Sequence, residues 1–327
     1  MIMRYLGRGE GLKEEINKRK DLRKTRGDIH KLVAMQNQIS NMSFRIEEKK
    51  IISTEEFKIF SEDMDYLINF FKSLAELIFL NGRMISFFSD NEHYQLNTDL
   101  IESSTQTIKS IKYCCSIGGF SDANTLIRKL RDDLIQYIYV LNIINSRNPF
   151  LNDSITLDDQ AVKAWLTNSV ADLEKPVKGK LEFQNYMKVL KENKSLKQVL
   201  IEYRLEKYWD TLRTRLNDYI HNNGTFYSHQ NLLKANNKNL KIHLNNIEHR
   251  TSYISSFFMV TLLLIDSSMI SSTDYVDYLD CDMDPPENSQ YFIASFVQDF
   301  IDRKINKIHP ELKQYLQNNN INSMKIE

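Results

Sequence analysis

The chain has 327 residues, of which 42% are hydrophobic and 26% charged, and its 43 basic and 43 acidic side chains give a formal net charge of zero. This length is enough for one large or two small domains with a substantial core, and the balanced charge argues against a uniformly basic nucleic-acid coat. Few glycines and prolines, together with long periodic segments rich in Leu, Ile, Lys, Glu and Asn, predict an all-α protein.

The cysteines and the apolar segments indicate the cellular compartment of the protein. Three cysteines, two of them adjacent at Cys114 and Cys115, do not make a disulfide framework, and MIMRYLGRGEGLKEE lacks an apolar core long enough for a signal peptide. The most apolar run, from Phe257 to Ile265, is about half of the ~20 residues that a membrane span requires. We therefore expect a cytoplasmic protein without membrane insertion, in which this run is a buried core helix.

Residues 1 to 50 are predicted to form a charged helical arm. Lys and Arg crowd residues 13 to 31, and the basic run KRKDLRKTR could contact RNA phosphates through charge alone. The alternative is a solvated helix or an arm used in oligomerisation, which also fits a thin apolar stripe of Ile16, Leu22, Ile29, Leu32 and Val33.

Residues 51 to 272 carry the pattern of a helical core. Apolar residues recur at helical spacing from Thr54 to Phe88, with Asn81 and Gly82 as a break, which predicts a core helix followed by a further turn. A second helix is expected over Asn97 to Ile117. After two glycines, a third helix from about Asp122 to Asn145 is apolar almost all round in its second half. We expect this third helix to be central.

The stretch from Val199 to Gly224, VLIEYRLEKYWDTLRTRLNDYIHNNG, combines a helical core pattern with the most chemically suggestive side chains. Its apolar residues follow one another at steps of four, three, four and three, which predicts one buried seam on an amphipathic helix. These residues are Leu205, Trp209, Leu212, Leu216 and Tyr219. At ~100° per residue, a separate polar arc faces away from the seam. It comprises Arg215, Asp218, His221 and Asn222.

Arg215 and His221, in the run RLNDYIH, resemble the Arg-x(4 to 6)-His signature of the HEPN superfamily. This superfamily consists of compact helical bundles and includes many metal-independent ribonucleases of toxin and phage-defence systems. Two other pairs with similar spacing, in Arg23–His30 and Arg303–His309, are interrupted by a glycine or followed by a proline. We favour the first pair because it lies on a strongly patterned helix.

A second segment adds to the resemblance. GFSDANTLIRKLRDDL, around Arg128 and Asp132, is similar to a helical element of the form A-x-x-L-x-R-x-x-x-acid in HEPN-like families. The i,i+4 spacing permits a surface ion pair worth only ~0.3 to 0.5 kcal/mol, whereas a functional Arg128 would reach a phosphate site beside His221. The resemblance covers residues 118 to 145 and 205 to 270 and implies a HEPN-like helical bundle with additional N- and C-terminal helices.

Residues 273 to 327 are predicted to form an acidic connection and a C-terminal helical tail. The carboxylates of Asp274 to Glu287 lack the glycine of a calcium loop, and the histidines and cysteines have no metal-binding spacing, so no metal or other cofactor is expected. The last ten residues, NNNINSMKIE, should fray.

The resemblance implies a metal-independent endoribonuclease in a toxin or antiviral defence role. His221 would move a proton, Arg215 would hold the phosphate, and Arg128, Asp218 and Asn222 would bind the RNA substrate. Along one helix Arg215 and His221 are ~9 Å apart in rise and ~120° apart in direction, so we expect a composite site at a homodimer interface.

The alternative function is non-catalytic. A HEPN-like protein could bind RNA or a nucleotide, or act as an interaction protein in a defence or toxin-antitoxin complex, with an antitoxin or another defence protein as its partner.

Overall fold

The computed structural model describes residues 30, 31, 33, 34, 50–80, 86–89, 92–146, 155–221, 223–225, 227, 230, 231, 237–320 and 322–327. The chain divides into two compact units, Met1–Ser53 and Thr54–Glu327. The predicted charged arm of residues 1 to 50 lies largely outside the described residues, and the following paragraphs concern the second unit.

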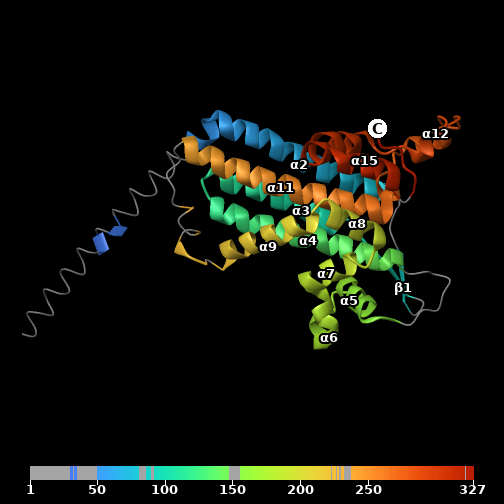
Figure 1. Ribbon diagram of the computed structural model, residues 1–327, viewed down its shortest axis with the longest axis horizontal. Coiled ribbons are helices and arrows are strands. Elements are labelled where there is room, and N and C mark those ends of the chain that lie inside the picture. The colour runs from blue at the N-terminus through green and yellow to red at the C-terminus, as the bar shows by residue number, and fades with distance from the viewer. Residues whose placement is uncertain are drawn as a thin grey trace, which may run out of the picture. The chain divides into compact units, whose positions relative to one another are not determined.

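Helices dominate the second unit, which confirms the predicted all-α class (Figure 1). The α-helices are α2 (Glu55–Leu80), α3 (Asp99–Ser116), α4 (Phe120–Ser146), α5 (Leu157–Leu166), α6 (Lys175–Lys178), α7 (Phe183–Leu190), α8 (Lys194–Glu202), α9 (Leu205–Ile220), α11 (Asn237–Asp266), α12 (Asp274–Asp280), α13 (Ser295–Phe300), α14 (Asn306–Ile308) and α15 (Pro310–Asn319). Short 3-10 turns are η1 (Val170–Asp172), η2 (Gly179–Leu181), η3 (Ser267–Ile270) and η4 (Ser289–Tyr291), and η5 (Ile301–Ile305) is a π-helix.

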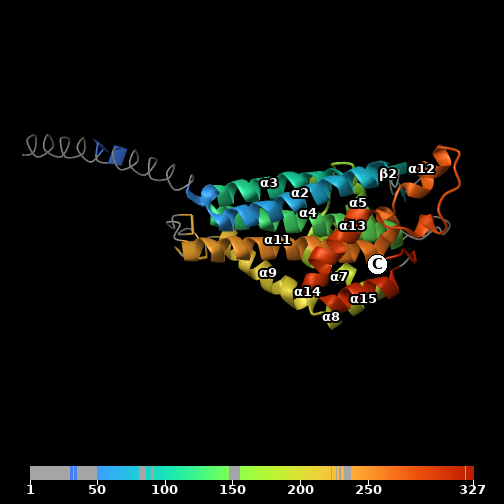
Figure 2. The ribbon, with the colours of Figure 1, turned by 90° about the horizontal axis from the view of Figure 1, so that it is seen from above.

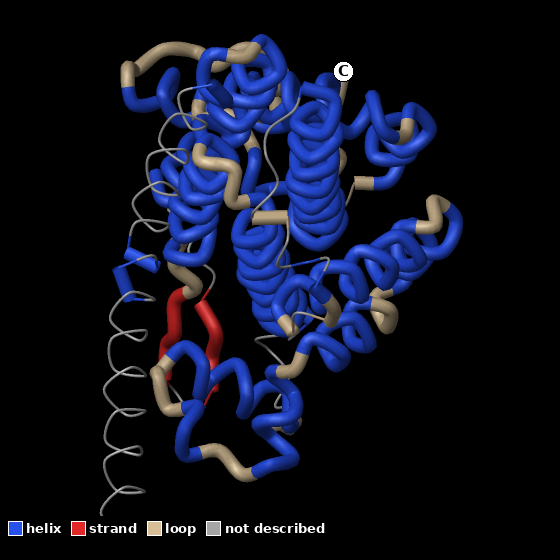
Figure 3. The backbone as a smooth tube through the Cα atoms, turned by 90° about the vertical axis from the view of Figure 1, so that its left-hand side faces the viewer, coloured by secondary structure: helices blue, strands red, loops and turns tan. Residues whose placement is uncertain are grey.

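A small antiparallel hairpin follows α2. Its strands are β1 (Ser86–Ser89) and β2 (Glu92–Gln95), and Ser86 pairs with Gln95. The sequence predicted a helix and a further turn up to Phe88, so the hairpin is a difference from that prediction. Figure 3 shows the hairpin beside the short helices, and β2 contacts α5.

Four long helices form the core of the bundle. The helix α3 packs between α2 and α4, and α11 packs against both α2 and α4 (Figures 1 and 2). Phe258 of α11 joins these layers, because its ring lies 5.9 Å from that of Phe71 on α2 and 6.0 Å from that of Tyr137 on α4. The sequence predicted that the helix from about Asp122 to Asn145 would be central. This helix is α4, which contacts α3, α7, α9 and α11.

The predicted apolar run lies in the C-terminal half of α11. Every residue from Phe257 to Ile265 is buried. The segment Asn239–Ile270 is long and apolar enough to cross a membrane, but 89% of its most apolar stretch is buried inside the bundle. It is therefore a core helix, as the sequence predicted.

Helix α9 packs against α4 through the predicted seam. Leu205, Trp209, Leu212, Leu216 and Tyr219 are all buried, which confirms this prediction. The helix does not extend back to Val199, however. Arg204 adopts the left-handed conformation with φ 54°, so the stretch from Val199 divides into α8 and α9.

The C-terminal residues return to the bundle. The ring of Phe300 stacks on that of Phe70 with centroids 4.0 Å apart. The predicted fraying of the last ten residues is wrong for part of that segment. Met324 and Ile326 are buried, and the backbone N–H of Lys325 donates to the carbonyl of Tyr291 at 2.8 Å. The alternation of apolar residues at 324 and 326 is the pattern of an extended segment with one buried face.

Candidate functional site

Arg215 and His221 lie at the C-terminal end of α9, and both side chains are exposed. His221 is the C-cap, with its backbone N–H donating to the carbonyl of Asn217 at 3.0 Å. Neither side chain forms a hydrogen bond or ion pair with another described residue. Burial raises the pKa of Tyr208, and the positive charge of Arg215 opposes that rise. Tyr208 and Arg215 are seven residues apart, so they lie on the same side of α9.

Asp218 is engaged within the turn that follows α9. Its carboxylate accepts a hydrogen bond from the Tyr227 hydroxyl at 3.1 Å and from the Asn223 side-chain amide at 2.8 Å. The other predicted substrate-binding residue of this segment, Asn222, lies outside the described residues. Asp218 thus holds Asn223 and Tyr227, which follow the end of α9, against that helix.

Arg128 forms the predicted ion pair with Asp132, with Nε 3.5 Å from Oδ2. Asp132 is shared, because Arg131 donates to its Oδ1 from Nε at 2.8 Å and from Nη2 at 2.5 Å. Among the described residues, no hydrogen bond, ion pair or ring contact joins Arg128 to Arg215 or His221. The structure therefore places Arg128 in a different group from the predicted catalytic pair.

That group contains two arginines that the sequence analysis missed. Arg131 is only 2% exposed, and its guanidinium lies 4.5 Å from the centroid of the Phe183 ring. Arg213 approaches the same ring at 5.9 Å. Burial lowers the pKa of Arg131, and the charges of Arg128 and Arg213 lower it further, although Asp132 opposes them. Arg128 and Arg131 therefore share the Asp132 carboxylate, whereas Arg213 lies on the Phe183 ring and pairs with Asp210 at 3.9 Å.

His221 shares a flank of α9 with part of this group. Residues Arg213, Asn217 and His221 follow at i, i+4 and i+8, so they lie along one side of the helix. Within the described part of the chain, Arg213 Nε and Asn217 Oδ1 are buried without a hydrogen-bond partner. The spacing of Arg213, Asn217 and His221 is present in the sequence, but only Arg215 matches the superfamily signature.

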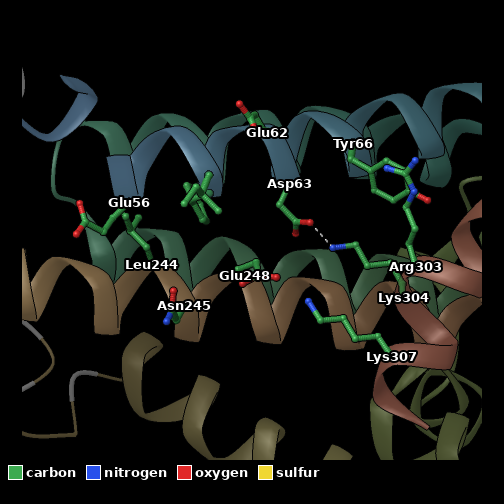
Figure 4. Close-up of a pocket in the computed structure, with 12 residues that line it drawn as sticks. Glu56, Glu62, Asp63, Tyr66, Leu244, Asn245, Glu248, Arg303, Lys304 and Lys307 are labelled. Carbon is green, nitrogen blue, oxygen red and sulfur yellow. Dashed lines mark hydrogen bonds and ion pairs between the residues drawn. The ribbon is translucent and has the colours of Figure 1, made fainter. Parts of the chain in front are cut away.

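A second site is a cleft of about 500 Å³ between α2, α11 and η5 (Figure 4). Lys304 is its central cation. This residue is 6% exposed, and its Nζ donates to Asp63 Oδ1 at 2.5 Å and to Ser252 Oγ at 3.2 Å. The second carboxylate oxygen of Asp63, Oδ2, is buried and has no hydrogen-bond partner among the described residues.

Further charged groups line both walls of the cleft. Tyr66 donates to Asp299 Oδ2 at 3.0 Å, and Arg303 Nε lies 2.7 Å from Asp299 Oδ1. Burial raises the pKa of Glu248, Asp63 adds to this rise, and Lys304, Lys307 and His249 oppose it. Glu248 therefore carries a proton more readily than an ordinary glutamate.

Comparisons with protein-family models, with curated proteins and with solved structures give no match. The HEPN resemblance rests on the residues quoted from the sequence. In the described ranges, no group of three or more His, Cys, Asp or Glu side chains is placed to hold a metal ion.

The two sites differ in the chemistry that their side chains offer. The α9 surface presents an imidazole and guanidinium groups, which suit proton transfer and phosphate binding. The cleft presents ammonium, guanidinium and carboxylate groups, which suit binding of a small polar ligand. We consider a function for each in turn.

Proposed function

We propose that this protein is a metal-independent endoribonuclease of the HEPN type, acting in the cytoplasm in a toxin or antiviral defence role. The observation that carries the proposal is that Arg215 and His221 are exposed and have no partner among the described side chains. Both lie exposed on a helix whose opposite side is fixed in the core, and neither is engaged with another described side chain. Such groups are available to a substrate.

The reaction needs few groups. A base removes the proton of the 2′-hydroxyl, the 2′-oxygen forms a bond to phosphorus, and the bond from phosphorus to the 5′-oxygen breaks as that oxygen takes a proton. The products are a 2′,3′-cyclic phosphate and a 5′-hydroxyl. In this proposal His221 transfers one of these protons, and Arg215 offsets the charge that grows on the phosphate oxygens.

The helix geometry requires a second copy of the chain. Arg215 and His221 are ~9 Å apart in rise and point ~120° apart, so one helix does not aim both at one phosphate. In a two-fold contact each copy contributes both residues, and Arg215 of one copy can face His221 of the other. Arg213, on the same flank as His221, and Arg128 would then hold phosphates of the RNA backbone.

The test is cleavage of mixed single-stranded and hairpin RNA by purified full-length protein in EDTA. His221→Ala and Arg215→Ala should each lower the rate at least ~100-fold, within the range ascribed to an acid-base group. Both side chains are exposed, so circular dichroism of both variants should match that of wild type. Removal of either side chain leaves no cavity in the core.

The chain supplies matched controls. Arg303→Ala and His309→Ala alter an Arg/His pair with the same spacing, yet Arg303 belongs to the cleft and His309 lies at the start of α15. Both control variants should cleave RNA at nearly the wild-type rate. Full activity of His221→Ala would transfer the catalytic role to another residue.

A second function, binding without cleavage, is favoured by the arginine group around Asp132. Arg128 and Arg213, both partly exposed, supply positive charge without a group that titrates near neutral pH. Such a protein would bind RNA or a nucleotide, or would meet an antitoxin or another defence protein. Saturable binding of RNA that stays intact, even after cellular extract is added, would support this function over the nuclease.

A further inference from the structure

The cleft between α2, α11 and η5 is built from parts of the chain that are far apart in sequence. Asp63 and Lys304, which meet in its floor, are separated by 241 positions. Its volume of about 500 Å³ falls within the range of small-molecule sites. Figure 4 shows Lys304 and Lys307 extending from the C-terminal segment toward the side chains of α2 and α11.

The cations of the cleft are not equivalent. Arg303 pairs with Asp299, and Lys304 pairs with Asp63. Lys307 is exposed and forms no hydrogen bond or ion pair with any residue that the structure describes. A ligand that carries negative charge would therefore find the Lys307 ammonium available, whereas the Arg303 guanidinium lies over the Tyr66 ring, 5.3 Å from its centroid.

On the α2 wall of the cleft, one carboxylate oxygen of Asp63 lacks a hydrogen-bond donor among the described residues. Lys304 satisfies Asp63 Oδ1, but Oδ2 has no donor among the described side chains. A carboxylate oxygen removed from water without a partner is unfavourable. Because 26% of the Asp63 side chain is exposed, a small rotation of the carboxylate would bring Oδ2 to a ligand hydroxyl or N–H group and remove that cost. Glu248, on the neighbouring wall, accepts or donates a hydrogen bond according to its protonation state.

The charge of the remaining lining limits the size of the ligand. Glu56 and Glu62 line the cleft from α2, and Figure 4 shows Glu56 at the end of the cleft away from Arg303. A polynucleotide that continued past Lys307 would bring its next phosphates toward these carboxylates, and like charges repel. A small molecule with one phosphate end and one neutral hydroxyl-bearing end avoids this repulsion.

We propose that this cleft binds a small sugar phosphate, of which a nucleoside 5′-phosphate is one form. The phosphate contacts Lys307, and the sugar hydroxyls donate to Asp63 and Glu248. The site is separate from Arg215 and His221, so it does not depend on the proposed nuclease.

The experiment is isothermal titration calorimetry of the full-length protein with four probes. These are ribose 5-phosphate, adenosine 5′-monophosphate, adenosine and inorganic phosphate. Ribose 5-phosphate or the nucleotide should bind with Kd below ~1 mM, and adenosine and inorganic phosphate should each bind at least ~10-fold more weakly. Equal affinity for the two phosphate esters would assign the site to sugar phosphates in general. Tighter binding of the nucleotide would show that the base contributes.

Two variants and one control locate the binding. Lys307→Ala should weaken binding of the better phosphate ester at least ~10-fold, because it removes the unpaired cation. Asp63→Asn should weaken it through the hydroxyl contacts, and circular dichroism will show whether this variant remains folded. Lys109→Ala removes an exposed lysine of α3 outside the cleft and should leave the affinity unchanged.

The outcomes decide the proposal. If neither phosphate ester binds wild type up to ~10 mM, a concentration at which even weak sites are occupied, the proposal is overturned. It is also overturned if Lys307→Ala and Lys109→Ala have equal effects. RNA cleavage that persists in Lys307→Ala would leave the proposed nuclease standing whichever result the calorimetry gives.

Discussion

Truncation of Trp209 separates the stability of α9 from the chemistry at its end. The indole is 1% exposed, stacks on Phe257 with ring centroids 4.3 Å apart, and faces Phe183 at 6.1 Å. A buried Trp replaced by Ala costs ~3 to 5 kcal/mol, which includes the cavity that remains. Trp209 Nε1 is buried without a partner among described residues. An unpaired buried donor destabilises a protein by ~1 to 3 kcal/mol, and removal of the indole N–H relieves part of this cost. We therefore expect Trp209→Ala to lower the free energy of unfolding by about 3 kcal/mol.

Trp209→Phe should be far milder. It keeps a stacked ring beside Phe257 and also removes the unpaired N–H, so we expect a loss below ~1.5 kcal/mol, as for swaps that nearly conserve volume. Urea denaturation followed by circular dichroism measures both changes, provided that the slope m is unchanged. Equal losses for the Ala and Phe variants, or a loss below ~1 kcal/mol for Ala, would refute the assignment of Trp209 to a packed core.

Two further predictions concern assembly and pH. Light scattering should give a homodimer at micromolar concentration, because the divided directions of Arg215 and His221 require two copies; a monomer with full nuclease activity would remove the composite-site argument. Glu248→Gln should stabilise the protein at neutral pH but not in acid. Burial raises the folded-state pKa of Glu248 above the unfolded value, so wild-type stability falls as pH rises between the two pKa values. Urea midpoints at pH ~3 and ~7 test this, and an equal difference between variant and wild type at both values would contradict it.

Periodicity predicted the parts of the fold that depend on local pattern. The seam of α9 and the buried run of α11 follow from spacing and hydrophobicity, because one face of each helix must leave water. The break at Arg204 did not follow. A left-handed residue is usually signalled by glycine or asparagine, and arginine gave no such signal.

The sites were less predictable because they depend on distant partners. The sequence marked Arg215 and His221 as polar positions away from the seam, but it could not reveal that Arg131 is buried beside Asp132 and Phe183. An arginine is rarely fully buried, and only the tertiary contacts explain this one. The cleft was missed for the same reason, since its central pair joins α2 to the C-terminal segment.

The π-helix η5 lets one continuous segment meet two different packing requirements. A π turn closes i→i+5 hydrogen bonds and so contains one residue more than an α turn. Relative to an uninterrupted α-helix, that extra residue rotates everything after it by ~100°. Phe300 before it stacks on Phe70, and Ile305 at its end is buried as well, while Lys304 between them meets Asp63. Loss of one residue here would bring the two halves out of register and turn Lys304 away from Asp63.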